Sequence, residues 1–188
     1  MPSDPVHPSQ VLILPGWQNS GPLHWQSRWE ARHGYTRVEQ HDWMTPLRGD
    51  WITRLEDVIA SLPGPRDAPV VLVAHSLGCI LTAAWASISR QVHRVRAALL
   101  VAPGDVERPA LRGPLHSWSP IAMQRLPFPS VLVASRDDPY CEFARAQTLA
   151  QAWGAQFVDA GLAGHLNAES GLDEWPAGHA HLQALMAA

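Results

Sequence analysis

Short apolar runs recur along the chain and alternate with segments of helical pattern. The runs cover residues 11–14, 36–40, 70–74, 97–102, 130–134 and 155–158, and the second is the weakest. Runs of this length with little polar alternation are typical of strands that are buried on both faces, as in a parallel sheet. The pattern therefore predicts six strands, most of them parallel.

Segments with helical periodicity lie between these runs. They cover residues 22–32, 51–62, 77–88, 143–153 and 176–187. We expect Pro22 at the first helical position, Asp50 as the N-cap of the second helix, and Gly154 just after the fourth helix. Strands that alternate with helices predict a doubly wound α/β sheet with helices on both faces. At 188 residues the chain predicts a single domain over 1–188.

One segment fits neither pattern. Residues 103–129 contain six prolines and join the fourth expected strand to the fifth. The segment is longer than an ordinary turn and too short for a second domain. Its apolar side chains include Leu111, Leu115 and Trp118. We expect this proline-rich segment to roof a shallow, partly open site.

Composition and charge exclude several classes of protein. Hydrophobic residues make up 46% of the chain, which is too many for a disordered segment. The net charge is −3 and the 14 basic residues form no run, which argues against nucleic-acid binding. The apolar runs are far shorter than the roughly 20 residues of a membrane span, and the first ten residues lack the features of a leader. These observations predict a cytoplasmic protein with no membrane segment.

The third apolar run leads into Ala74-His75-Ser76-Leu77-Gly78, followed by a helical segment. A strand, a tight turn and a helix are the context of the G-x-S-x-G nucleophile elbow. The residues two before and two after the serine must be small, and alanine replaces the first glycine here. The turn would raise the Ser76 hydroxyl above the carboxyl edge of the sheet. We therefore expect Ser76 to be a catalytic nucleophile rather than a simple N-cap.

A serine nucleophile needs a base to take its proton and an acid to orient that base. In hydrolases with this elbow the order along the chain is serine, acid, histidine. Asp137 and Asp138 follow the fifth expected strand, and His165 follows the sixth. Asp138 is favoured over Asp137, which remains the alternative acid. His165 is the expected base.

The negative charge of the reaction intermediate needs backbone donors. The Leu77 N–H, at the start of the helix after the elbow, is one candidate. The second donor in such enzymes comes from the loop after the first long strand. Gly16 lies in that loop and permits close backbone approach, so the Trp17 N–H is the expected second donor.

Four segments resemble the small serine hydrolases grouped with bacillar YdeN and the retinoblastoma-binding protein 9. They are LPGWQNSGPLHWQSRWE, VAHSLGC, LPFPSVLVASRDDPYC and AGHLNAESGLDEWP. The resemblance implies an α/β-hydrolase fold without a large cap domain and a strand order of 2-1-3-4-5-6. It also implies Ser76 as nucleophile, Asp138 as acid and His165 as base. The L-x-C-x-E partner motif of the mammalian relative is incomplete, because Leu81 stands where it has glutamate.

Other side chains have weaker assignments. Gly16, His75 and the loop tryptophan Trp118 are candidate substrate-binding residues. The tryptophans on helical faces are expected in the core, and Cys79 and Cys141 are expected to pack as small apolar residues. We expect no metal, because the close pair His179 and His181 would point to different helix faces. No cofactor is expected.

These observations predict a serine hydrolase that cleaves a small or medium carboxylic ester through an acyl-enzyme on Ser76. An amide or a thioester is an alternative substrate. The partner would be a small-molecule acyl substrate, and the sequence assigns no oligomeric state. A second hypothesis is a hydrolase-fold binding protein whose triad is vestigial, because fold alone does not determine function.

Overall fold

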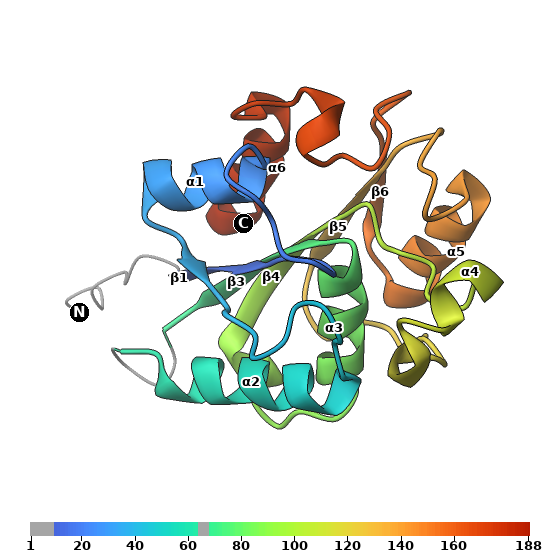
Figure 1. The fold of residues 1–188 in the computed structure, drawn as a ribbon. Coiled ribbons are helices and arrows are strands. Elements are labelled where there is room, and N and C mark those ends of the chain that lie inside the picture. Colours follow the sequence, from blue (N-terminus) through green and yellow to red (C-terminus); the bar gives the residue numbers. More distant parts are fainter. Residues whose placement is uncertain (1–9, 64–67) are drawn as a thin grey trace.

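Six parallel strands form one sheet in the computed structural model, which describes residues 10–63 and 68–188 (Figure 1). The strands are β1 (Gln10–Leu14), β2 (Thr36–Arg37), β3 (Val70–His75), β4 (Val95–Val101), β5 (Ser130–Ala134) and β6 (Gln156–Asp159). Their order is β2-β1-β3-β4-β5-β6, and every neighbouring pair is parallel. The predicted fold class and strand order are confirmed. Residues 1–9, most of the stretch in which we expected no leader, lie outside the described residues.

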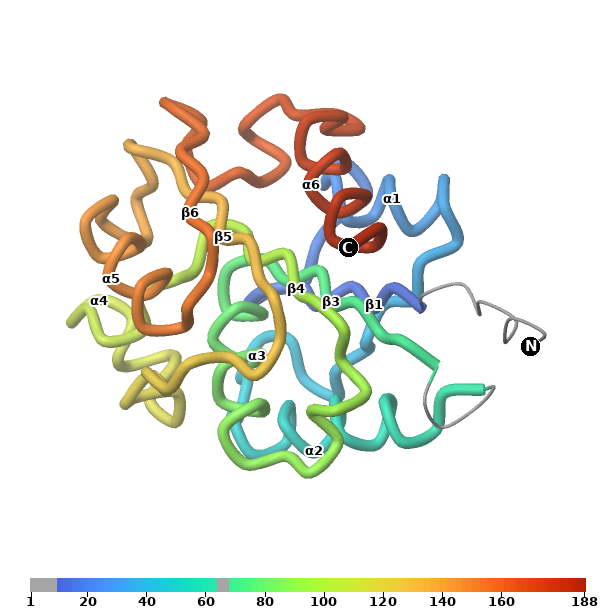
Figure 2. Tube along the Cα trace, turned by 180° about the vertical axis from the view of Figure 1, so that it is seen from behind, coloured from blue at the N-terminus to red at the C-terminus, as the bar shows by residue number. Residues whose placement is uncertain are grey.

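Helices cover both faces of this sheet. They are α1 (Trp25–His33), α2 (Arg48–Ser61), α3 (Leu77–Ala86), α4 (Pro109–Arg112), α5 (Phe143–Trp153) and α6 (Pro176–Ala187). Helices α1 and α6 lie on one side of the sheet, whereas α2 and α3 lie on the other, as both views show (Figures 1 and 2). Among the described residues no helix is long and apolar enough to cross a membrane.

The alternation of side chains along the strands divides the core into two parts. In β1, Leu12 and Leu14 pack on the side of α2 and α3, whereas Val11 and Ile13 pack on the side of α1 and α6. All four are buried. Buried apolar surface on both faces explains why the strands are continuous apolar runs. This burial also holds the sheet in place, and the loops that follow β3, β5 and β6 lie at its carboxyl edge.

The main differences from the expected elements are at helix ends. Helix α1 begins at Trp25, because the His24 side chain accepts a hydrogen bond from the Gln26 N–H and caps it; Pro22 is therefore not its first residue. Helix α2 begins at Arg48, so Asp50 lies in its first turn and is not the cap. Helix α3 ends at Ala86, and Ile88 is 67% exposed. The residue that caps a helix depends on the geometry of the preceding loop, and the periodicity of apolar residues in the sequence does not show that geometry.

The proline-rich segment is largely packed against the body of the protein. It contains α4 and a 3₁₀ turn over His116–Trp118. Trp118 is fully buried, packs edge-to-face on Trp51 and donates a 2.9 Å hydrogen bond from Nε1 to the Pro46 carbonyl. This anchoring places residues 104–115 beside the carboxyl edge of the sheet.

Candidate active site

The turn between β3 and α3 holds Ser76 in a strained conformation. Its φ is 54° and its ψ is −117°, a region that non-glycine residues rarely adopt and that costs on the order of 1–3 kcal/mol. The Ser76 N–H donates to the Val101 carbonyl at 3.0 Å, which ties the turn to β4. A Cβ at Gly78 would clash with the Leu14 carbonyl oxygen, so glycine allows α3 to approach β1. The small residue after the serine is thus required by packing.

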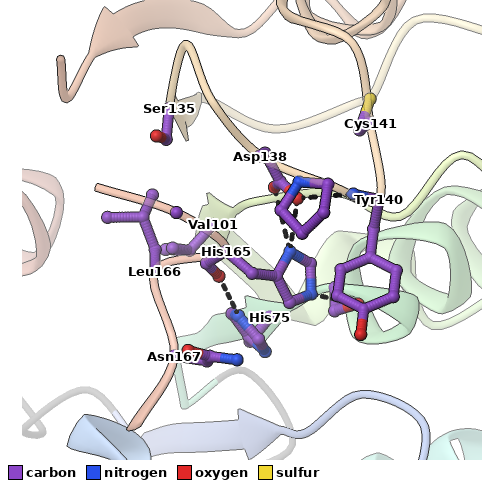
Figure 3. A network of polar contacts seen from close by, with 12 residues as sticks. His75, Val101, Ser135, Asp138, Tyr140, Cys141, His165, Leu166 and Asn167 are labelled. Carbon is purple, nitrogen blue, oxygen red and sulfur yellow. Dashed lines mark hydrogen bonds and ion pairs between the residues drawn. The ribbon is translucent and has the colours of Figure 1, made fainter. Parts of the chain in front are cut away.

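A line of hydrogen bonds joins three loops at the carboxyl edge of the sheet. His165 Nε2 lies 2.9 Å from Ser76 Oγ, and His165 Nδ1 lies 2.9 Å from each carboxylate oxygen of Asp138 (Figure 3). The side chains of His165 and Asp138 are 9% and 4% exposed. A carboxylate accepts from Nδ1–H, which leaves Nε2 to accept the Ser76 hydroxyl proton. Desolvation strengthens such charge-assisted contacts.

Asp137, the alternative acid, contacts a different set of atoms. Its Oδ1 accepts from Ser135 Oγ at 2.6 Å and from the Gly164 N–H at 2.9 Å. These bonds, the Ser135 hydroxyl first, hold the pKa of the Asp137 carboxyl below its usual range. Asp137 therefore fixes the loop that carries His165, whereas Asp138 contacts the imidazole itself.

Two further histidines pack beside His165. His75 Nε2 lies 2.9 Å from the His165 carbonyl oxygen, so this nitrogen carries the proton and donates (Figure 3). The ring of His24 packs edge-to-face on His75, with centroids 4.7 Å apart. Burial lowers the pKa of His24 to about 3, with smaller contributions from His165 and Arg37. Burial also holds the pKa of His75 well below its usual range, so both rings stay neutral at neutral pH.

A cavity of about 350 Å³ opens beside Ser76. The expected residues Gly16, Trp17, His75 and Leu77 line it. Trp118 does not, and its assignment to the substrate site is wrong, because its ring is buried in the core. The proline-rich segment forms one wall of the cavity rather than a complete roof.

The remaining walls contain residues that sequence reasoning did not single out. They include Asn19, Val106, Tyr140, Asn167 and Glu169. All lie in loops or short turns, which carry no periodicity. Three of them lie in or beside segments that the sequence did indicate: Asn19 in the loop after β1, Val106 in the proline-rich segment and Tyr140 beside the acid.

The loop after β1 lies directly against the elbow. A Cβ at Gly16 would lie 2.8 Å from Ser76 Cβ and 3.3 Å from the Leu77 nitrogen, so only glycine permits this approach. A hydrogen bond from the Asn19 N–H to the Gly16 carbonyl closes the turn that follows. Trp17, next along the chain, lines the same cavity as Leu77.

The two cysteine thiols are protected from reaction. Cys79 and Cys141 are buried and pack as small apolar residues, as predicted. Burial raises the pKa of the Cys141 thiol to about 12 and raises that of Cys79 further. Both thiols therefore stay protonated. Within residues 10–63 and 68–188 no group of three histidine, cysteine or acidic side chains is placed to hold a metal ion.

Comparisons with known proteins agree with this geometry. A family model described as serine hydrolase matches residues 11–184. A protein described as a YdeN-like hydrolase, from Pectobacterium atrosepticum, is 29% identical, with a TM-score of 0.81, and the match covers 94% of this chain and 90% of that one.

More distant structures share the fold. The ydeN gene product of B. subtilis is 21% identical with a TM-score of 0.74, and the match covers 96% of this chain and 100% of that one. Est1E of Butyrivibrio proteoclasticus, solved with ferulic acid bound, is 11% identical with a TM-score of 0.72, over 98% and 92% of the two chains. None of the curated proteins compared with the chain matches it.

Proposed function

The chain belongs to the serine hydrolase family, and from that premise we propose that it cleaves a small or medium carboxylic ester through an acyl-enzyme on Ser76. One observation carries the proposal. His165 lies 2.9 Å from the Ser76 hydroxyl on one side and 2.9 Å from the Asp138 carboxylate on the other. A strained serine, a base and a buried carboxylate in one line form the arrangement that activates a hydroxyl nucleophile.

In the first half of the reaction Ser76 Oγ attacks the acyl carbon while His165 Nε2 takes the hydroxyl proton. The carbonyl oxygen becomes an oxyanion, and the backbone N–H groups of Trp17 and Leu77 donate to it. The His165 imidazolium then gives its proton to the leaving oxygen. The bond to the leaving group breaks, which releases an alcohol and leaves the acyl group on Ser76.

In the second half a water molecule replaces the alcohol. His165 takes a proton from the water, and the resulting hydroxide attacks the acyl carbon. The second oxyanion collapses and His165 returns the proton to Ser76 Oγ, so that the carboxylic acid leaves and the enzyme is restored. Asp138 keeps Nδ1 protonated throughout and stabilises the imidazolium.

The size of the cavity supports small or medium substrates. Its volume of about 350 Å³ lies near the lower end of the range of small-molecule sites. The wall after β4 is apolar, since it contains the side chains of Val106, Leu111 and Leu115. This wall suits a short aliphatic acyl chain.

Hydrolysis of nitrophenyl acetate, butyrate and octanoate by the purified protein tests the proposal. We expect turnover of the two shorter esters, and loss of at least about 10³-fold in kcat in Ser76→Ala. Ser61→Ala is the matched control, because Ser61 is exposed at the end of α2 and should leave turnover unchanged. A folded wild-type protein that cleaves none of the esters, or a Ser76→Ala variant that is as active as wild type, would contradict the proposal.

A further inference from the structure

The two ends of the cavity differ in polarity and charge, and we propose that the ester's alcohol group carries an ammonium cation while its acyl group is aliphatic. This inference rests on the proposed function, because it assigns the two halves of an ester to the two ends. The juxtaposition that carries it is a carboxylate on the segment after His165, apolar side chains on the segment after β4, and an aromatic ring between the two.

The apolar end begins beside the nucleophile. A Cβ at Gly104 would lie 3.4 Å from Ser76 Oγ, so the segment after β4 passes next to the reacting hydroxyl. From there it supplies Val106, Leu111 and Leu115 to the cavity wall. Burial of methylene groups against such a wall stabilises a bound aliphatic chain.

The leaving group must lie at the other end for a chemical reason. His165 Nε2 has to deliver its proton to the leaving oxygen, so that oxygen lies next to the imidazole. The segment that follows His165 directly supplies Asn167, Ala168 and Glu169 to the cavity wall. The alcohol portion of an ester therefore extends toward these residues.

The charge at this end is negative. Glu169 is exposed at the cavity rim, and within the described residues its carboxylate makes no hydrogen bond or ion pair. The described residues that line the cavity include no lysine or arginine. The neighbouring guanidinium of Arg37 is held by the Glu30 carboxylate at 2.8 Å. A cation entering this end thus meets an unpaired carboxylate, and no arginine or lysine among the described cavity-lining residues opposes it.

An aromatic face adds to the attraction for a cation. The ring of Tyr140 lines the cavity beside His165, with centroids 4.5 Å apart, and the residue is 43% exposed (Figure 3). The Tyr140 carbonyl accepts a hydrogen bond from the Asp105 N–H at 3.1 Å, so the ring lies between the two ends of the cavity. The face of a tyrosine ring attracts ammonium groups through its quadrupole. An anionic leaving group would meet the same ring and carboxylate unfavourably.

The test compares butyrylcholine with its uncharged isostere, in which carbon replaces the ammonium nitrogen. The ammonium also makes choline the better leaving group, so the measured quantity is how the ratio of the two kcat/KM values changes on mutation. We expect Glu169→Gln to lower the ratio of charged to uncharged ester by about 3- to 5-fold, the size of one exposed and partly screened charge interaction. High salt should lower the wild-type ratio in the same direction.

Glu142→Gln is the matched control, because Glu142 is an exposed carboxylate outside the cavity lining and should leave the ratio unchanged. If wild type cleaves both esters and Glu169→Gln leaves the ratio within 2-fold of wild type, the inference is wrong and the proposed function stands. If wild type cleaves neither ester nor any nitrophenyl ester, the proposed function fails and this inference fails with it.

Discussion

Two groups of closely packed histidines lie at opposite ends of α1, and they differ in what surrounds them. In the front group His24, His75 and His165 pack at centroid separations of 4.7 and 4.8 Å. In the rear group His33 and His179 stack at 4.2 Å and 12° between α1 and α6. The rings are in contact in both groups, edge-to-face in the front group and stacked in the rear group, so ring contact alone does not mark a reactive site.

The difference lies in the neighbours of the end histidine. His165 lies between a strained serine and a carboxylate that is 4% exposed. His179 instead contacts the Tyr35 hydroxyl at 2.9 Å, and within the described residues it makes no contact with a carboxylate. Burial lowers the pKa of His179 and so keeps it neutral. Nucleophile activation requires the hydroxyl and the carboxylate together, and only the front group has both.

The largest expected effect comes from replacing the carboxylate of the front group. Asp138→Asn should lower kcat by about 10³- to 10⁴-fold, because an amide does not stabilise the imidazolium or fix its tautomer. Asp137→Asn should change kcat by less than about 5-fold, since an amide oxygen still accepts from Ser135 and Gly164. Ester hydrolysis with circular dichroism as a fold check measures both. Equal losses of kcat in the two variants would contradict the assignment of Asp138, and not Asp137, as the acid that acts on His165.

The next effect tests the contact between the β1 loop and the elbow. A methyl group at Gly16 meets Ser76 and Leu77, so Gly16→Ala should shift the proposed oxyanion donors and lower kcat by about 10²-fold. Gly49→Ala is the control, because nothing lies within 4 Å of a Cβ there and alanine favours the α2 helix. Steady-state kinetics give the result. An unchanged kcat in Gly16→Ala would show that the loop after β1 does not position a donor for the reaction.

A smaller effect concerns stability at acid pH. Below about pH 6.5 the unfolded chain protonates His24, whereas the folded chain does so only near pH 3, so the unfolded state binds more protons between these values. The free energy of unfolding should therefore fall as pH decreases, by up to about 1.4 kcal/mol per pH unit for this one residue.

His24→Asn should flatten that dependence by about the same amount, because asparagine caps α1 without titrating. Urea unfolding at a series of pH values between 4 and 7 measures the slope in both proteins. Parallel curves for wild type and variant would contradict the buried, neutral state of His24.

The smallest effect is expected in the rear group. His179→Asn removes the contacts to Tyr35 and His33 and should lower the free energy of unfolding by about 1 kcal/mol. Ester hydrolysis should stay within about 2-fold of wild type. A large loss of activity with an intact fold would show that the rear group contributes to the reaction, and the two histidine groups would then not differ in function.

Much of the sheet could be predicted because strands and helices carry periodic signals. β5 and α6 begin and end where the apolar pattern places them, and Gly154 follows α5 in the left-handed conformation that glycine favours. The elbow could be recognised because packing requires a small residue at Gly78. Ser76, Asp138 and His165 could be assigned together because each follows a strand and therefore lies at the same edge of the parallel sheet.

The cavity walls could not be predicted in the same way. The sequence places Trp118 in a loop and makes it a candidate for the substrate site. Its burial depends on a hydrogen bond from the indole N–H to the Pro46 carbonyl, a contact between distant parts of the chain. The position of Glu169 in the cavity wall depends on the conformation of the loop after His165, and no residue spacing in the sequence indicates that conformation. Contacts between residues far apart in the sequence determine where these loop side chains lie.

Labelling with a fluorophosphonate, followed by intact mass and peptide mapping, tests whether Ser76 is the activated nucleophile. Such a reagent needs an activated serine. We expect one adduct, on Ser76, on the folded protein and none after heat denaturation, with Asp138→Asn labelled far more slowly than wild type. A folded wild-type protein that takes up no reagent, or that is labelled at another residue, would contradict the assignment of Ser76, His165 and Asp138.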